Sequence, residues 1–185
     1  RSTLFPYTTL FRSRTGSAIA WAAALERGNG PTSLVFSRQN LAFQARTPAQ
    51  IDDIRRGGYV LVEPDSEPRA IIIATGSEVA LAVKAQLQLA MDGVAVRVVS
   101  MPSTTVFDRQ DASYRSLVLP PTLPCVAIEA GVSDLWRKYV GRSGIVIGMD
   151  RFGESAPAAD LFAHFGFVPE RLVDAVTTLL ALARR

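Results

Sequence analysis

The stretch AIIIATGSEV, residues 70–79, decides the fold of this chain. Its first half, Ala70 to Ala74, is a short unbroken apolar run, which is typical of a strand buried on both faces of a parallel sheet. Gly76 then turns the chain into a long helix with an apolar face, and we expect Ser77 to cap that helix. A strand, a glycine turn and a helix in immediate succession indicate an α/β fold.

The same alternation of strand and helix patterns continues to the end of the chain. Expected strands are 59–63, 70–75, 94–100, 125–129 and 145–149, and further helices are expected at 108–117, 134–140, 155–165 and from Pro169 onward. This order predicts a mainly parallel five-stranded sheet with helices on both faces. Because only a short turn, 64–68, joins the first two strands, the first strand can pair antiparallel at one edge.

The N-terminal part of the chain is organised differently. Residues 15–46 contain one expected helix and one expected strand, which is too little to form a domain. Thr47, Pro48 and Gln50 form the pattern of a capping box with proline in the first turn, so 47–57 is expected to be a linker helix that ends at Gly57. We therefore expect one domain at 58–185, preceded by a helix–strand remnant of another.

Residues 1–14 are unusual in another way. The segments RSTLF (residues 1–5) and TLFRS (residues 9–13) are nearly a sequence repeat. The run 3–13 resembles the conceptual translation of a common DNA-sequencing adapter. We interpret 1–14 as an assembly artefact that is not native, with a short natural strand or arm as the alternative. The underlying nucleotide sequence would separate the two interpretations.

The distribution of charge argues against nucleic-acid binding. The net charge of +3 depends on Arg1, Arg12 and Arg14, since without these three the chain has 17 basic and 17 acidic residues. The remaining sequence has no lysine–arginine stripe and no basic patch rich in aromatic residues.

The composition is that of an ordinary soluble globular protein, with 48% hydrophobic and 20% charged residues. The sequence shows neither an apolar run long enough to cross a membrane nor a secretory signal. The single Cys125 lies in the apolar run 125–128, where a buried structural thiol is expected rather than a nucleophile or a metal ligand. These features fit a cytoplasmic protein.

Arg38 is the candidate binding residue of this sequence. It follows the apolar run Leu34 to Phe36, which fits a strand buried on both faces of a parallel sheet. Ligands bind at the carboxyl ends of such strands, and a guanidinium group there is suited to a phosphate. From the pattern alone, the favoured interpretation is a surface arginine that caps the strand end, and a phosphate ligand is the alternative.

Structural roles rather than catalytic ones are expected for Glu78, Glu129 and His164. Glu78 in the first turn of a helix complements the helix dipole and would repel a phosphate, so we expect a capping role for this turn. Glu129 ends a strand without a second carboxylate or histidine nearby in the sequence, which favours a packing or interface role. His164 is a lone histidine between two phenylalanines and is expected to be a surface or packing residue.

Several runs of sequence, taken together and in order, resemble transketolases. The run 30–41 (GPTSLVFSRQNL) resembles the end of the pyrimidine-binding domain of that family. The runs that resemble its C-terminal domain are 73–79 (IATGSEV), 97–103 (RVVSMPS), 107–111 (FDRQD), 129–131 (EAG) and 152–157 (FGESAP). The resemblance covers about residues 17–185, since the helix that begins with SAIAW also matches.

The resemblance implies a function for the parent protein. Transketolases transfer a two-carbon ketol unit between sugar phosphates in the pentose phosphate pathway, using thiamine diphosphate and a divalent cation such as Mg²⁺. Arg38 then matches the arginine that binds the phosphate of the sugar substrate. The resemblance also implies a homodimer with active sites between subunits, and a C-terminal domain that supports the dimer without binding the cofactor.

The sequence also departs from the family pattern. The Gly-Asp-Gly motif that begins the diphosphate and metal site is absent, as are the family's activating glutamate and substrate-binding histidines, which lie upstream. We therefore expect a C-terminal fragment that holds no cofactor, has no catalytic residue and is inactive alone. A stand-alone α/β module in assembly or regulation, and a fragment of another thiamine diphosphate enzyme, are the alternatives.

Overall fold

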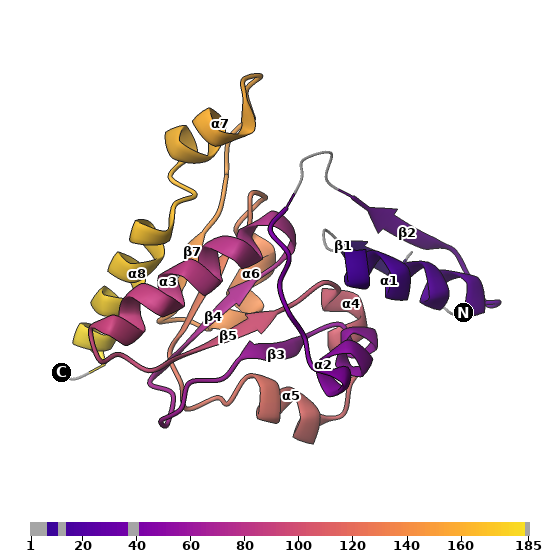
Figure 1. The fold of residues 1–185 in the computed structure, drawn as a ribbon, viewed down its shortest axis with the longest axis horizontal. Coiled ribbons are helices and arrows are strands. Elements are labelled where there is room, and N and C mark those ends of the chain that lie inside the picture. Colours follow the sequence, from indigo (N-terminus) through magenta and orange to yellow (C-terminus); the bar gives the residue numbers. More distant parts are fainter. Residues whose placement is uncertain (1–6, 11–13, 37–40, 184–185) are drawn as a thin grey trace.

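The computed structural model describes residues 7–10, 14–36 and 41–183. They form a larger unit around a five-stranded sheet and a smaller unit of one helix and two strands, seen at the right of Figure 1. The smaller unit contains β1 (Tyr7–Leu10), α1 (Arg14–Glu26) and β2 (Thr32–Val35).

The larger unit has the predicted fold. Its strands are β3 (Tyr59–Val62), β4 (Ala70–Ala74), β5 (Val96–Ser100), β6 (Cys125–Ile128) and β7 (Ile145–Ile147). They lie in the order β3-β5-β4-β6-β7, and all neighbours are parallel except β3 and β5, which pair antiparallel. The mainly parallel sheet and its antiparallel edge strand are both confirmed.

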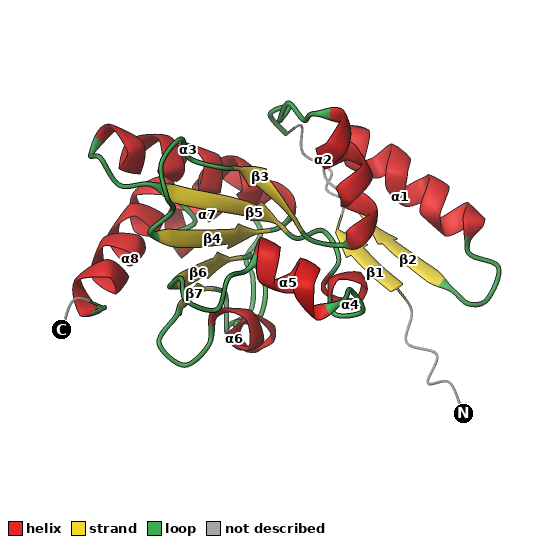
Figure 2. Cartoon of the chain, turned by 90° about the horizontal axis from the view of Figure 1, so that it is seen from below, coloured by secondary structure: helices red, strands yellow, loops and turns green. Residues whose placement is uncertain are grey.

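Helices cover both faces of this sheet (Figure 2). On one face lie α3 (Val79–Met91) and α8 (Pro169–Leu182), and on the other lie α4 (Thr104–Phe107), α5 (Ala112–Val118) and α6 (Asp134–Val140). Successive residues of a strand point to opposite faces, so Ile72 packs in the first core while Ile71 and Ile73 pack in the second. All five residues of β4 are buried because it is the central strand.

The linker between the two units follows the sequence prediction closely. Helix α2 (Pro48–Asp53) begins with a complete capping box, in which Thr47 and Gln50 each bond the other's backbone N–H. A 3-10 turn, Ile54–Arg56, follows, and Gly57 ends it with a φ of 83°. A side chain at position 57 would have its Cβ 2.4 Å from the carbonyl oxygen of Ser103, so the close approach of the two backbones also requires glycine.

Two predicted helix starts are wrong. Ser77 does not cap α3, because residues 76–78 form a 3-10 turn in which the Ser77 hydroxyl donates to the Glu78 carboxylate at 2.7 Å. The helix predicted at 108–117 begins at Ala112 as α5, after α4 has ended at Phe107, and Asp111 rather than Asp108 caps it by accepting from the N–H of Tyr114 at 2.8 Å.

The smaller unit differs from the expected helix–strand remnant by one strand. Residues 7–10 form β1, which pairs in parallel with β2. This strand lies within the segment 1–14 that we interpret as an artefact, and its presence does not test that origin. Residues 1–6 and 11–13 of the segment 1–14 lie outside the described residues.

The burial of β2 also differs from the prediction. Its residues alternate between half-buried and exposed, and Val35 is 40% exposed, so the strand is not buried on both faces. The physical reason is that β2 has one described neighbour, β1, and belongs to a two-stranded sheet rather than to a broad sheet covered on both sides.

Candidate functional site

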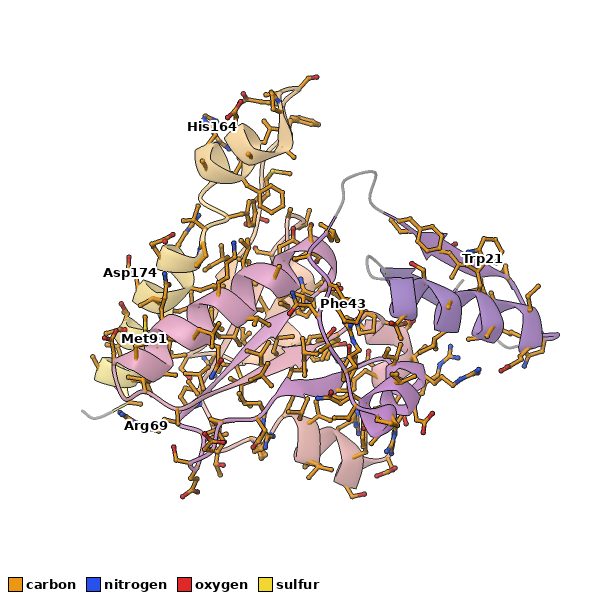
Figure 3. All side chains as sticks on the ribbon, in the orientation of Figure 1. Trp21, Phe43, Arg69, Met91, His164 and Asp174 are labelled. Atoms are coloured by element: carbon orange, nitrogen blue, oxygen red, sulfur yellow. The ribbon has the colours of Figure 1, made fainter. Side chains whose placement is uncertain are left out.

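Arg38, the sequence-predicted phosphate ligand, lies outside the described residues, as do Ser37, Gln39 and Asn40. The structure describes the two segments that flank it. On the N-terminal side, the ring of Phe36 stacks on Trp21 of α1 with a centroid distance of 6.5 Å. Trp21 is 55% exposed, and Figure 3 places it in the smaller unit, on the far side from the five-stranded sheet.

On the C-terminal side, residues 41–46 pass along the carboxyl edge of the larger sheet. This extended segment encloses a small cavity of about 40 Å³ against the ends of β4 and β5. The residues that line the cavity include Leu41, Gln44, Arg46, Gly76, Ser77 and Ser100. The segment after Arg38 is therefore packed at the edge where open α/β sheets bind their ligands.

Arg46 is the residue that fixes this segment, and sequence reasoning missed it. Its Nε donates to the hydroxyl of Tyr59 at 2.7 Å, and its Nη1 donates to the carbonyl oxygen of Gln44 at 2.7 Å. Tyr59 is the first residue of β3 and is only 2% exposed. No local pattern reveals a contact between side chains 13 residues apart, because the partner is defined by the fold.

A larger hollow, of about 540 Å³, lies between the start of α3 and α7 (Ala158–Phe165). Its lining includes Ser77, Glu78, Glu154, Ser155, Phe162 and Phe167. None of the residues of α7 is buried, and Figure 1 shows this helix standing apart from the sheet. The hollow is therefore an open, mainly apolar groove with carboxylates at its border.

Glu129, at the carboxyl end of β6, is bound to its neighbours rather than to a catalytic partner. Its Oε2 accepts from the indole N–H of Trp136 at 2.6 Å, and Trp136 is only 1% exposed. This contact joins β6 to α6 and gives the carboxylate a structural role.

His164 lies on the exposed part of α7, as Figure 3 shows. Its Nε2 is 3.5 Å from the carboxylate of Glu154 and 3.3 Å from Nη2 of Arg151, while its ring meets Phe165 edge to face. The surface and packing role expected from the sequence agrees with this environment.

The remaining reactive groups also have structural environments. Cys125 is buried, and burial raises the pKa of its thiol to about 12, which leaves it protonated at neutral pH. Within residues 7–10, 14–36 and 41–183, no three His, Cys, Asp or Glu side chains come together in a way that could hold a metal ion. None of the helices in this part of the chain has the length and apolar character needed to cross a membrane.

Comparison with protein families connects the fold to known proteins. Residues 57–168 match the family described as the transketolase-like TK C-terminal domain. The chain is 58% identical over 166 residues to Transketolase 1 of Vibrio parahaemolyticus, a match that covers 89% of this chain and 25% of the relative. Transketolase 1 of Aliivibrio fischeri is 56% identical over the same length and coverage.

Solved structures give the same result. A transketolase from Leishmania mexicana superposes with a TM-score of 0.86 at 38% identity, covering 94% of this chain and 25% of that one. A Pichia stipitis transketolase in complex with sedoheptulose-7-phosphate superposes with a TM-score of 0.84 at 31% identity, covering 97% and 26% of the two chains. The chain thus spans about a quarter of the length of these proteins, and it belongs to the transketolase family.

Proposed function

We propose that this chain works as the C-terminal part of a transketolase, which transfers a two-carbon ketol unit between sugar phosphates. The observation that carries the proposal is the 58% identity to a curated transketolase over 166 residues, which continues through both units of the chain. The proposal includes the expected homodimer and a cytoplasmic location.

Within this function, we assign Arg38 to the phosphate of the sugar substrate. A guanidinium group is always charged, and its planar donors match the oxygens of a phosphate. The Pichia stipitis relative was solved with a sugar phosphate, sedoheptulose-7-phosphate, which is the class of ligand that this assignment requires. The segment after Arg38 is held at the carboxyl edge of the sheet, which is the ligand-binding side of α/β folds.

Thiamine diphosphate and a divalent cation would be held by other parts of the enzyme. A hard cation such as Mg²⁺ takes oxygen ligands, usually carboxylates together with substrate phosphates. The described residues do not fit such a site, because the metal-binding side chains among them form no cluster of three. The groove beside α7 does not suit a diphosphate either, since its charged lining consists of Glu78 and Glu154.

A hybrid enzyme tests the proposal. The 166 residues of this chain that match Vibrio parahaemolyticus Transketolase 1 would replace the corresponding quarter of that enzyme, and ketol transfer would be measured with phosphorylated and unphosphorylated ketose donors. We expect the hybrid to be active, and Arg38→Ala to raise the KM for phosphorylated donors by about 10- to 100-fold with a smaller effect on unphosphorylated ones.

Arg142→Ala is the matched control, because it removes an exposed arginine in the turn before β7. This variant should leave the KM for both donors unchanged. A folded hybrid without transfer activity would contradict the proposed function. Equal effects of Arg38→Ala on both donors would show that Arg38 does not recognise the phosphate.

A further inference from the structure

The small cavity at the carboxyl edge of the larger sheet brings three parts of the chain together. Its lining comes from the start of α1 (Gly16), from the segment 41–46 and from the larger unit, which contributes Gly76, Ser77 and Ser100 among others. Its volume of about 40 Å³ is enough for about three water molecules. The cavity can therefore hold a small ion but not a sugar or a nucleotide.

The charge at this cavity is positive. Among the described residues that line it, Arg46 is the only charged one. The Arg46 side chain is half-buried, and it donates to two neutral acceptors, the Tyr59 hydroxyl and the Gln44 carbonyl oxygen. Within residues 7–10, 14–36 and 41–183, no carboxylate forms an ion pair with Arg46. Because charges withdrawn from water are normally paired, this guanidinium lacks the counterion that such a position favours.

Ser100 adds a hydroxyl without a described partner. It is only 5% exposed, and its hydroxyl makes no hydrogen bond to any residue that the structure describes. Residues directly opposite each other on neighbouring strands have their side chains on the same face of the sheet. Ser100 lies opposite Tyr59, which packs in the first core with Val79, so its hydroxyl faces the cavity that these two residues also line. A ligand with an acceptor atom would supply the bond that this buried hydroxyl lacks.

Two helices begin at the cavity. Gly16 lies in the first turn of α1, and Val79 is the first residue of α3, which continues directly from the 3-10 turn 76–78. The N-terminal end of a helix carries a partial positive charge, since its first N–H groups have no partner within the helix. Both helix ends therefore add to the positive potential that Arg46 creates.

The nearest carboxylate along the chain belongs to another hollow. Glu78 is 1% exposed and lines the larger groove beside α7, and it is not among the residues that line the small cavity. Its Oε1 accepts from the hydroxyl of Ser77 at 2.7 Å. Its negative charge offsets part of the positive potential at the start of α3, so we expect an anion to bind with moderate affinity.

We propose that the small cavity is a binding site for a small inorganic anion, such as chloride or phosphate. Arg46 supplies the charge, and the hydroxyls of Ser100 and Tyr59 donate hydrogen bonds. Tyr59 accepts its described bond from Arg46, so its own proton can be donated to the ion. Because the lining comes from α1, the segment 41–46 and the larger unit, a bound anion would stabilise the association of the two units. Its binding does not depend on the ketol-transfer reaction.

Binding can be measured on the 185-residue chain itself. Sodium chloride and sodium phosphate would be titrated separately by calorimetry at pH 7, with sodium gluconate keeping the ionic strength constant. Gluconate is too large for this cavity and serves as the neutral background. We expect saturable binding of chloride, of phosphate or of both, with a dissociation constant of about 1–10 mM. The arm that saturates identifies the ion, and the melting temperature should rise along the same curve.

Two variants locate the site. Arg46→Met removes the charge while keeping a long side chain, and it should weaken binding by about 30-fold or more. Ser100→Ala removes one donor and should weaken binding by about five- to ten-fold. Arg142→Ala is the matched control, because it changes the net charge by the same amount in an exposed turn before β7, at the opposite edge of the sheet. Its affinity should stay within about two-fold of the parent chain.

Ser100→Ala also separates a ligand-binding hydroxyl from a structural one. In gluconate alone, the melting temperature of this variant should equal or exceed that of the parent chain, because the lost hydroxyl has no described partner. When the binding ion is added, the parent chain should gain more. A lower melting temperature of the variant in gluconate would overturn the role of Ser100. The site itself is overturned if neither ion shows saturable binding, or if Arg46→Met and Arg142→Ala bind the ion equally well.

Discussion

Trp136 donates its indole N–H to the carboxylate of Glu129 at 2.6 Å, and this bond joins α6 to the end of the buried strand β6. Trp136 is among the largest fully buried side chains described, and Glu129 is the first residue after the strand. A bond between a buried donor and a charged acceptor is worth more than an average hydrogen bond. The contact is therefore a local determinant of stability at the carboxyl edge of the sheet.

Substitution of either partner should show this contribution. Trp136→Phe removes the donor and part of a buried ring, so the free energy of unfolding should fall by about 2–4 kcal/mol. Glu129→Gln keeps an oxygen that can accept the bond, and its cost should be below about 1.5 kcal/mol. Urea unfolding at neutral pH measures both values. An unchanged stability in Trp136→Phe would contradict the role given to this bond.

Substitution of three glycines by alanine should separate two contributions to the loss of stability, the steric clash of the new Cβ and the strain of a left-handed backbone. Gly57→Ala should cost more than about 3 kcal/mol, because the residue has a φ of 83° and its Cβ would lie 2.4 Å from the Ser103 carbonyl oxygen. Gly93→Ala has a similar φ of 72° with nothing within 4 Å, so its cost should be about 1 kcal/mol.

Gly28→Ala is the control of this series, because Gly28 has no neighbour within 4 Å and no left-handed φ. Its effect on the free energy of unfolding should be within about 0.5 kcal/mol of zero. Thermal unfolding of the three variants gives the order of costs. Equal costs at positions 57 and 93 would show that the approach of Ser103 is not a steric restriction.

Cys125 should make stability depend on pH in the alkaline range. Burial raises the pKa of its thiol from 9 to about 12, so the folded state keeps a proton that the unfolded state loses. The stabilisation is complete below pH 9 and decreases as the pH rises toward 12, by up to about 1.4 kcal/mol for each pH unit. Other buried groups titrate in this range, and for this reason the comparison needs a variant.

Cys125→Ala removes this proton and keeps a small apolar side chain. Between pH 8.5 and 10.5, the free energy of unfolding of the variant should fall less steeply than that of the parent chain. Parallel curves for the two proteins would show that the folded thiol ionises as easily as the unfolded one. Alkylation of the native protein at pH 8 should also be slow until denaturant is added.

The two tryptophans should differ in their access to solvent. Trp21 is 55% exposed and Trp136 is 1% exposed, so acrylamide should quench Trp21 much more strongly. In Trp21→Phe, the remaining emission should come from Trp136, with a shorter wavelength and weak quenching. Strong quenching in this variant would mean that α6 does not cover Trp136 in solution.

Much of the fold could be predicted because its signals are local. The apolar run at 70–74 indicates a central strand, the turn at 64–68 is too short for a crossover, and Thr47 with Gln50 marks a helix start. The errors also have local causes. Ser77 and Asp108 are good capping residues by type, but Ser77 lies within a 3-10 turn and Asp108 follows the last residue of α4, so neither stands at the start of an α-helix.

The candidate site was less accessible to sequence reasoning. Arg38 could be selected because it lies in a run that resembles a known family, whereas the partner of Arg46 is Tyr59, which the fold brings close from the beginning of a strand. The exposure of Val35 and Phe36 was missed for a similar reason. An apolar run indicates a strand but does not tell how many neighbouring strands are present to cover it.

The attachment of residues 46–57 to β3 and to the start of α4 has a practical consequence for protein engineering. Gly57 bonds Ser103 through its carbonyl oxygen, Gln50 holds two carbonyls of β3, and Arg46 reaches Tyr59. A recombinant C-terminal domain cut at Gly58 would lose all three attachments and expose the edge of its sheet. An expression boundary upstream of Arg46 should instead give a soluble domain that keeps all three of these attachments.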